Sequence, residues 1–210
     1  MKLIVITPAR DVEDEQSLVT KMFENGLQTL HLRKPKHSTN KLREYIKEIP
    51  TQFHDRIVIH SHHDLAIKFN LKGIHLGKIH LTKRWQYFII RLRLKFKFAH
   101  ISKSRSYSRL QQLYNKEERK FDYFLLGTMY NNMTGELYSG FYEDGLSNAL
   151  RTCGKKVVAR GGTSLSSVLK SKKLGFHGVA FNSYIWNADQ PFDNYLKILK
   201  EFETQNIEIE

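Results

Sequence analysis

The stretch KVVARGGTSLSSVLKSKKLGFHGVAFNSYIW, from Lys156 to Trp186, decides the fold. Two apolar runs in it, Val157–Ala159 and Gly178–Phe181, are too short for helices and predict buried strands. Between the runs, apolar residues at roughly helical spacing predict a helix, and Gly175 is typical of the residue that ends one. The order strand, helix, strand indicates a parallel βαβ unit.

A glycine pair, Gly161 and Gly162, follows the first of these strands, and we expect Thr163 or Ser164 to cap the helix after it. Glycines leave backbone N–H groups accessible, and the start of a helix attracts negative charge. We therefore predict a phosphate site between the glycine pair and the turn Asn182-Ser183. A glycine pair after a strand is also a common tight turn, so that alternative stays open.

The composition predicts one globular domain covering residues 1–210, with 40% apolar residues. The single cysteine, Cys153, excludes an intramolecular disulfide and a cysteine-based metal cluster, and it favours a reducing, cytoplasmic location. No stretch approaches the roughly 20 apolar residues that a membrane helix requires. We therefore expect a cytoplasmic protein with no membrane segment.

The net charge of +13 is concentrated between Lys83 and Arg105, which contain eight basic and no acidic residues. We expect the first half of this run to end a surface helix and the part from Lys95 onward to enter a strand. Clustered cations suit nucleic acids. However, no helix-turn-helix pattern or aromatic platform accompanies the run, so we favour a solvated basic face over a nucleic-acid groove.

Repetition along the chain indicates the fold. The predicted strands before the opening stretch are Leu3–Ile6, Leu27–Leu32, Arg56–His60, Gly73–Gly77, Phe96–Ser102 and Tyr123–Leu126. The predicted helices include Glu13–Asn25, one that Ser38 caps, Ser61–Asn70 and Asn194–Phe202. Eight strands alternating with helical segments predict an α/β fold, a single-domain (β/α)8 TIM barrel. In such barrels the loops after strands seven and eight commonly bind phosphate, and reactive residues follow the strands.

The residues after the predicted strands are polar and basic, with few carboxylates. They are Thr7, Arg33, Lys34, His60, Ser61, His80, His100, Ser102, Thr128 to Thr134, the glycine pair and Asn182-Ser183. Arg33 and Lys34 could clamp phosphate oxygens, although an Arg-Lys pair in a loop is often only solvated. The histidines could bind a soft divalent metal, but no known ligand spacing supports one. We therefore expect no metal on them, and we expect His75 to be a hydrogen-bonded core residue.

These segments resemble the thiamine phosphate synthase family of small TIM barrels, which includes thiazole tautomerase-like members. The resemblance rests on LHLR (30–33) beside QLREK, IHS (59–61) with DLA (64–66) beside INDxxDLA, GIHLG (73–77) beside GVHLG, IS (101–102) beside the serine after strand five, FDY (121–123) to Gly127 beside ADYxxxGP, VARGG (158–162) beside AIGG, and GVAFNS (178–183) beside GVAVVS. It covers nearly the whole chain.

The resemblance implies a transferase that joins a hydroxymethylpyrimidine diphosphate to a thiazole phosphate and releases pyrophosphate with the help of Mg²⁺. It implies that Arg33 and Ser102 hold the diphosphate. Gly161, Gly162, Asn182 and Ser183 would hold the thiazole phosphate, and Thr134 falls on the threonine of the family's TxTK loop.

Several positions depart from the family pattern. Ser61 and His80 stand where the family has its two metal-binding aspartates, and Gly135 replaces the loop lysine. His31 and His60 replace the glutamine and asparagine that contact the pyrimidine, and Pro35 replaces a lysine for which Lys34 or Lys36 could substitute. Without the two carboxylates the usual oxygen ligands for Mg²⁺ are missing.

Three functions therefore stay open. The first is a divergent synthase in which Lys34 and its basic neighbours partly replace the metal. The second is an isomerase that moves a proton on a thiazole phosphate carboxylate, with His100 or His60 as general acid or base. The third is a regulator that binds a phosphorylated ligand. In each case we expect small phosphorylated molecules as partners, with a homodimer left open.

Overall fold

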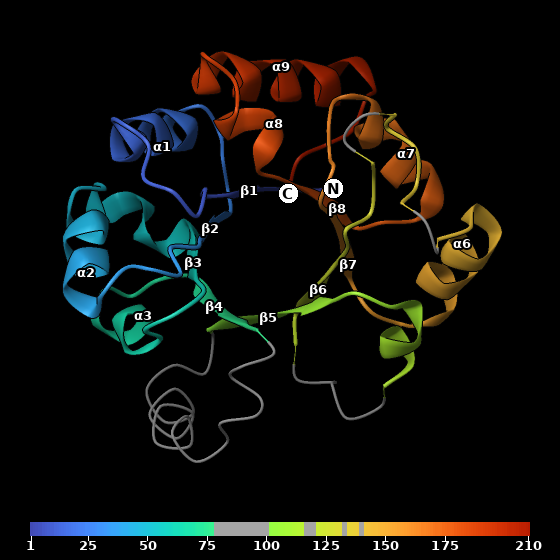
Figure 1. Cartoon of the computed structure of the whole chain (residues 1–210), viewed down its shortest axis with the longest axis horizontal. Coiled ribbons are helices and arrows are strands. Elements are labelled where there is room, and N and C mark those ends of the chain that lie inside the picture. The colour runs from blue at the N-terminus through green and yellow to red at the C-terminus, as the bar shows by residue number, and fades with distance from the viewer. Residues whose placement is uncertain (78–100, 116–120, 132–133, 139–140) are drawn as a thin grey trace.

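The computed structural model describes residues 1–77, 101–115, 121–131, 134–138 and 141–210, and within them the strands form a closed barrel (Figure 1). All neighbouring strands pair in parallel, and the last pairs with the first. The strands are β1 (Lys2–Ile6), β2 (Leu30–Leu32), β3 (Ile57–Ile59), β4 (Gly73–Leu76), β5 (Ser102–Tyr107), β6 (Tyr123–Leu126), β7 (Val157–Arg160) and β8 (Gly178–Phe181). The predicted (β/α)8 barrel is confirmed.

Helices surround the barrel on its outer side (Figure 1). They are α1 (Glu15–Glu24), α2 (Thr39–Lys47), α3 (Asp64–Lys68), α6 (Glu143–Thr152), α7 (Ser166–Leu174), α8 (Ser183–Trp186) and α9 (Pro191–Thr204), with short 3-10 helices η1 (Thr51–Arg56) and η2 (Leu110–Tyr114). Ser38 caps α2 as predicted, because its hydroxyl oxygen accepts from the Lys41 amide. Among the described residues, no helix has the length and apolar character needed to cross a membrane.

The cap predicted for α7 is wrong. Leu165 occupies the N-cap position, and no side chain caps the helix. The Thr163 hydroxyl instead donates to the carbonyl oxygen of Ala180 in β8, at 2.8 Å. The hydroxyl therefore ties the loop after β7 to the neighbouring strand.

The prediction for the fifth strand is also wrong: β5 begins at Ser102, the residue where the predicted strand ends. Ser104 and Ser106 both bond to His75 in the lumen of the barrel, so the inner face of β5 is polar. The apolar residues that predict a strand therefore lie in the segment before β5. Most of the basic run and its predicted helix and strand, residues 83–100, lie outside the described residues.

The lumen of the barrel has two unlike halves. One half is an apolar cluster on β1, β6, β7 and β8 that includes Ile4, Ile6, Leu125, Val158 and Ala180. The other half, on β2 to β5, contains histidine and serine side chains bonded to one another and to Tyr123. Buried polar side chains cost stability unless they are hydrogen-bonded, and apolar side chains would fill the same space without that cost. The polar half is therefore the part of the barrel in which a functional role for the side chains is expected.

Candidate active site

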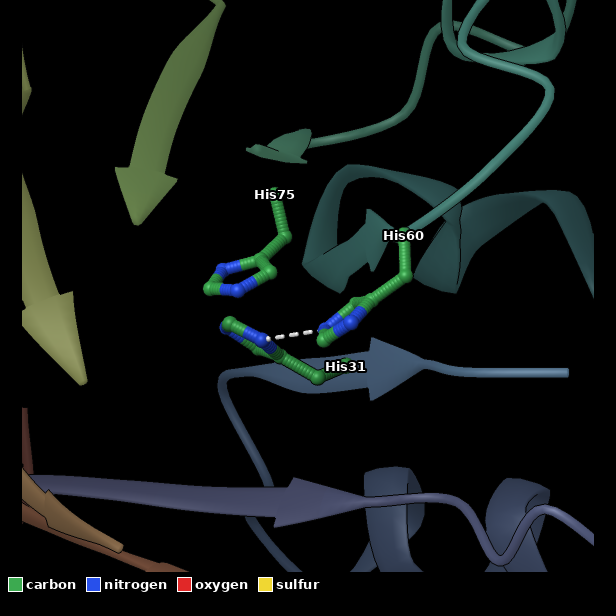
Figure 2. Close-up of side chains that lie close together, drawn as sticks. All are labelled: His31, His60 and His75. Carbon is green, nitrogen blue, oxygen red and sulfur yellow. Dashed lines mark hydrogen bonds between the residues drawn. The ribbon is translucent and has the colours of Figure 1, made fainter. Parts of the chain in front are cut away.

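Three imidazoles occupy the polar half of the lumen (Figure 2). His31 lies in β2, His60 directly follows β3, and His75 lies in β4, so that adjacent parallel strands bring the rings together. His31 Nδ1 lies 2.9 Å from His60 Nε2, and the rings of His60 and His75 stack with centroids 4.2 Å apart. The predicted hydrogen-bonded role of His75 is confirmed by its contacts with Ser104 and Ser106.

The environment of this cluster disfavours the charged forms of His31 and His60. Burial, together with the charges of Lys72 and Arg160, lowers the pKa of His31 to about 3. Burial also lowers the pKa of His60 well below its ordinary value, with further contributions from His75 and His31. A neutral imidazole has one N–H donor and one lone pair, so each ring can both donate to a neighbour and accept or coordinate.

A cavity of about 510 Å³ opens at the carboxyl ends of the strands beside this cluster. The residues that line it are Ile6, Arg33, His60, Thr128, Tyr130, Asn131, Tyr138, Arg160, Gly161, Gly162, Thr163, Ala180, Asn182 and Ser183. We call it the anion cavity, because the described residues of its lining include two arginines and no aspartate or glutamate. The structure thus brings together Arg33, His60, the glycine pair and the Asn182-Ser183 turn.

Arg33 and Arg160 give the anion cavity its positive charge. Burial and the charge of Arg33 lower the pKa of Arg160, which indicates electrostatic repulsion between the two guanidinium groups. Among the ion pairs of the described residues, neither arginine has a carboxylate partner. Two cations held together without a counterion attract an anion strongly. Sequence reasoning missed Arg160, although its place directly before the glycine pair could have indicated it.

The glycine pair presents its backbone to the same cavity. Gly161 and Gly162 have φ values of 86° and 69°, in the left-handed region that favours glycine. The Gly161 carbonyl oxygen accepts from the amides of Met129 and Tyr130. Within the described part of the chain, no hydrogen bond is donated by the amide of Gly161 or Gly162, so both N–H groups can serve a ligand.

Asn182 and Ser183 also line the anion cavity, but the Asn182 side chain has a structural task. Its Nδ2 donates to the carbonyl oxygens of Ile6 at 2.8 Å and Thr7 at 3.1 Å, which joins the end of β8 to the end of β1. The backbone carbonyl oxygen of Asn182 accepts from the amides of Ile185 and Trp186 in α8. The turn therefore fixes the rim of the cavity.

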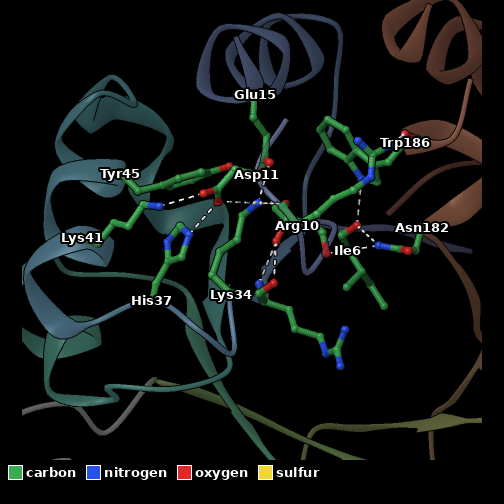
Figure 3. A network of polar contacts seen from close by, with 12 residues as sticks. Ile6, Arg10, Asp11, Glu15, Lys34, His37, Lys41, Tyr45, Asn182 and Trp186 are labelled. Carbon is green, nitrogen blue, oxygen red and sulfur yellow. Dashed lines mark hydrogen bonds and ion pairs between the residues drawn. The ribbon is translucent and has the colours of Figure 1, made fainter. Parts of the chain in front are cut away.

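Lys34 does not line the anion cavity, which corrects its predicted catalytic role. Its Nζ is bonded to Glu15 Oε2 at 2.5 Å and to the Arg10 carbonyl oxygen at 2.7 Å, and the two charged side chains are 1% and 2% exposed (Figure 3). Tyr45 donates to the other oxygen of Glu15. A fully buried lysine with these partners cannot substitute for a metal at a solvent-facing substrate, and instead anchors the loop after β1.

Around Lys34 lies an ion-pair network with a buried centre, Glu15, Lys34 and Tyr45, and an outer part, Asp11, His37 and Lys41; we call the whole the buried ion-pair network (Figure 3). Burial is the main reason that the pKa of Tyr45 is raised well above its ordinary value. At the network's outer edge, hydrogen bonds from Lys41 and His37 lower the pKa of the exposed Asp11 to about 2. The network joins α1 to the loop after β2 and to α2.

The structure also corrects the position of Ser102. It starts β5 and pairs with Gly73 at the start of β4, so it lies at the end of the barrel opposite to the anion cavity. The physical cause is the misplaced strand: Ser106, four residues later, is the serine near the carboxyl end of β5, where it bonds to His75 Nε2 at 2.9 Å. Ser102 therefore cannot reach the diphosphate that was assigned to it.

The remaining predicted residues lie apart from the anion cavity or outside the described ranges. Thr134 is exposed, and its hydroxyl oxygen accepts from the Glu136 amide within the loop after β6. Thr128, Tyr130 and Asn131 line the cavity from that loop instead. Ser61 is half-buried and is not part of the cavity lining. His80 and His100 lie outside the described residues.

Comparison with known proteins shows the family to which the chain belongs. The family model for thiamine monophosphate synthase matches residues 3–185. A thiamine-phosphate synthase of Flavobacterium psychrophilum is 25% identical over 211 residues, which cover 95% of this chain and 98% of that protein. A thiamine-phosphate synthase of Methanobrevibacter smithii is 21% identical over 206 residues, which cover 97% of this chain and 95% of that protein.

Among solved structures, the thiamine phosphate pyrophosphorylase from Bacteroides thetaiotaomicron is similar over 98% of both chains, with 27% identity and a TM-score of 0.78. The agreement extends along the whole barrel, from β1 to the helices after β8. Because the family model matches well over half of the residues, the chain belongs to the thiamine monophosphate synthase family.

Proposed function

We propose that this chain is a transferase of the synthase type, which joins a hydroxymethylpyrimidine diphosphate to a thiazole phosphate and releases pyrophosphate. The observation that carries the proposal is the anion cavity, in which Arg33, Arg160 and the amides of the glycine pair face one space. Both proposed substrates carry phosphate groups, and the cavity of about 510 Å³ falls in the size range of small-molecule sites.

The reaction breaks the bond between the pyrimidine methylene carbon and the diphosphate oxygen, and forms a bond from that carbon to the thiazole nitrogen. Negative charge grows on the departing pyrophosphate while the methylene carbon becomes positive. Arg33 and Arg160 donate to the diphosphate oxygens and stabilise that growing charge. The amides of Gly161 and Gly162 hold the phosphate of the thiazole, which places its nitrogen toward the reacting carbon.

The residues of the anion cavity do not fit the Mg²⁺ that the family resemblance implies. Mg²⁺ takes oxygen ligands and is normally held by one or two carboxylates. Among the described residues the lining has no aspartate or glutamate, and Ser61 stands at one of the two expected aspartate positions. In this proposal the two arginines, and not Mg²⁺, stabilise the negative charge of the departing pyrophosphate.

Turnover with both substrates tests the proposal. The purified chain is incubated with the pyrimidine diphosphate and the thiazole phosphate, with Mg²⁺ or with EDTA, and pyrophosphate release and the coupled product are measured. We expect both products in equal amounts, and we expect the Arg160→Ala variant to form them on the order of 100- to 1,000-fold more slowly. Absence of pyrophosphate under both conditions contradicts the transferase proposal.

A second candidate is an isomerase that transfers a proton on a thiazole phosphate carboxylate. His60 favours it, because its imidazole lines the anion cavity and is held in place by His31 at 2.9 Å. A neutral imidazole there can accept a proton from a ligand whose phosphate rests on the glycine pair. Interconversion of the two thiazole tautomers without pyrophosphate release, lost in His60→Asn, distinguishes this function from the transferase.

A further inference from the structure

The histidine cluster has the arrangement of a metal-binding site. One ring nitrogen from each of His31, His60 and His75 lies within 4.8 Å of the other two (Figure 2). The nitrogens of a tetrahedral Zn²⁺ site lie about 3.3 Å apart, given Zn–N distances of about 2.0–2.1 Å. The pair His31 Nδ1 and His60 Nε2, at 2.9 Å, thus has to separate by only a few tenths of an ångström.

We propose that His31, His60 and His75 bind one divalent transition-metal ion, with Zn²⁺ as the leading candidate. The ligand atoms are Nδ1 of His31 and Nε2 of His60 and His75. His31 lies in β2, His75 lies in β4, and His60 is the first residue after β3, so three adjacent strands of the barrel fix the positions of the three ligands.

The second ring nitrogens of His31 and His75 lie next to hydroxyl groups outside the cluster. His31 Nε2 lies 2.6 Å from the Tyr123 hydroxyl, and His75 Nδ1 lies 2.8 Å from the Ser104 hydroxyl. A metal-bound imidazole usually donates its second N–H to an oxygen in this way, which fixes the tautomer and the ring orientation. The Ser106 hydroxyl, now 2.9 Å from His75 Nε2, would give up that contact when the metal binds.

The donor set selects the kind of metal. Three imidazoles without a carboxylate suit Zn²⁺, Co²⁺, Ni²⁺ or Cu²⁺, whereas Mg²⁺ requires oxygen ligands.

The site opens toward the anion cavity, because His60 belongs to both. Three neutral ligands leave the ion with its full 2+ charge close to Arg33, whose charge already acts on His60. An anion in the cavity compensates that charge. Metal affinity therefore rises when an anion is bound, and the fourth coordination position is available to it.

Metal binding is measured directly on the full chain after removal of metals with EDTA. The chain is titrated with Co²⁺ by absorption spectroscopy and with Zn²⁺ by equilibrium dialysis, and Mg²⁺ serves as the comparison ion. We expect one Co²⁺ or Zn²⁺ per chain, an intense absorption typical of four-coordinate Co²⁺, and no Mg²⁺ binding to this site. A weak spectrum typical of six oxygen ligands in the unmodified chain overturns the proposal without reference to any variant.

Substitutions locate the site. His60→Asn and His31→Gln should lower Co²⁺ affinity by more than the roughly 10- to 100-fold that loss of an outer hydrogen bond costs. Tyr123→Phe, which removes such a bond, should lower it by about that amount and keep the intense spectrum. The matched control is His177→Gln, since His177 is an exposed histidine before β8, at the amino end of the barrel.

Circular dichroism in EDTA verifies that each variant is folded before metal is added. Unchanged Co²⁺ affinity in folded His60→Asn and His31→Gln places the metal elsewhere and overturns the proposal, and unchanged affinity in Tyr123→Phe overturns the assigned coordination. Because the readout is metal binding, it stands apart from turnover: a chain that binds Zn²⁺ here but releases no pyrophosphate refutes only the transferase.

Discussion

Two regions with basic side chains meet at the loop after β2, and they differ in whether those side chains have carboxylate partners. In the buried ion-pair network, Lys34 contacts Glu15 at 2.5 Å and approaches Asp11 at 4.0 Å. In the anion cavity, Arg33 and Arg160 have no carboxylate partner among the described ion pairs. Cations that are neutralised inside the protein stabilise the fold, and cations left without a counterion are available to a ligand.

Neighbouring residues reach these different regions because of the geometry of an extended chain. Side chains alternate between the two faces of a strand, so His31 and Arg33 point into the barrel and its cavity while Leu32 and Lys34 point toward the helices. Arg33 and Lys34 look equivalent in the sequence, but as successive residues of an extended chain their side chains point to opposite faces.

The largest effect should come from removing the lysine of the buried ion-pair network. Lys34→Met leaves the Glu15 carboxylate buried with the Tyr45 hydroxyl as its one remaining side-chain donor among the described residues, so we expect the free energy of unfolding to fall by about 3–5 kcal/mol. Urea unfolding measures it. The double variant Lys34→Met/Glu15→Leu should regain most of the loss, whereas a loss under about 1 kcal/mol in the single variant would show that the pair is not a structural anchor.

The anion cavity should respond in the opposite way. Arg160→Ala should lower turnover, or phosphate affinity in a binding assay, on the order of 100- to 1,000-fold, because one donor to a charged oxygen is lost. The free energy of unfolding should change by less than about 1 kcal/mol, since no ion pair is broken. Arg151→Ala, an exposed arginine of α6, is the control. A stability loss as large as that of Lys34→Met would make Arg160 structural.

A glycine comparison tests the backbone of the cavity. Gly161→Ala places a Cβ 3.0 Å from Thr128 Cα at a φ of 86°, whereas Gly26→Ala has a φ of 92° and nothing within 4 Å. Each should cost about 1–3 kcal/mol of unfolding free energy from backbone strain, measured by urea unfolding. Only Gly161→Ala should also weaken thermal stabilisation by inorganic phosphate. Equal phosphate response in both variants would remove the glycine pair from the binding site.

The smallest effect should appear at the exposed edge of the network. Asp11 has its pKa lowered from 3.8 to about 2 by Lys41 and His37, so its ion pairs stabilise the folded state above pH 3.8 and are lost as the pH falls through 2. Asp11→Asn should cost about 0.2–1 kcal/mol at pH 7, and less in high salt, because the carboxylate is exposed. Urea unfolding at several pH values checks that the difference disappears near pH 2.

The fold could be predicted from the sequence because its signals are local. Short apolar runs such as Val157–Ala159, followed by amphipathic segments, repeat along the chain, and eight such units are typical of a parallel barrel, whereas a doubly wound open sheet usually has fewer. The exception is β5, where the inner residues are Ser104 and Ser106. Strand detection depends on apolar side chains, and a strand that faces a polar lumen does not provide them.

The candidate site could be predicted only in part. The place of Gly161, Gly162, Arg33 and His60 in one cavity follows from the rule that carboxyl ends of parallel strands meet at one face. Lys34 was misassigned, because a basic residue after a strand looks the same whether its partner is solvent or Glu15. Arg160 was overlooked, since its relation to Arg33 depends on strands that lie far apart in the sequence.

By itself, the sequence determined the barrel and the turn at the glycine pair, because hydrophobic periodicity and backbone conformation are properties of neighbouring residues. Only the tertiary structure decided which charges are neutralised and which histidines meet, because Lys34 finds Glu15, and His31 finds His60 and His75, across separate helices and strands. Electrostatic contacts between such residues depend on their distance in space, and that distance is fixed when the barrel closes.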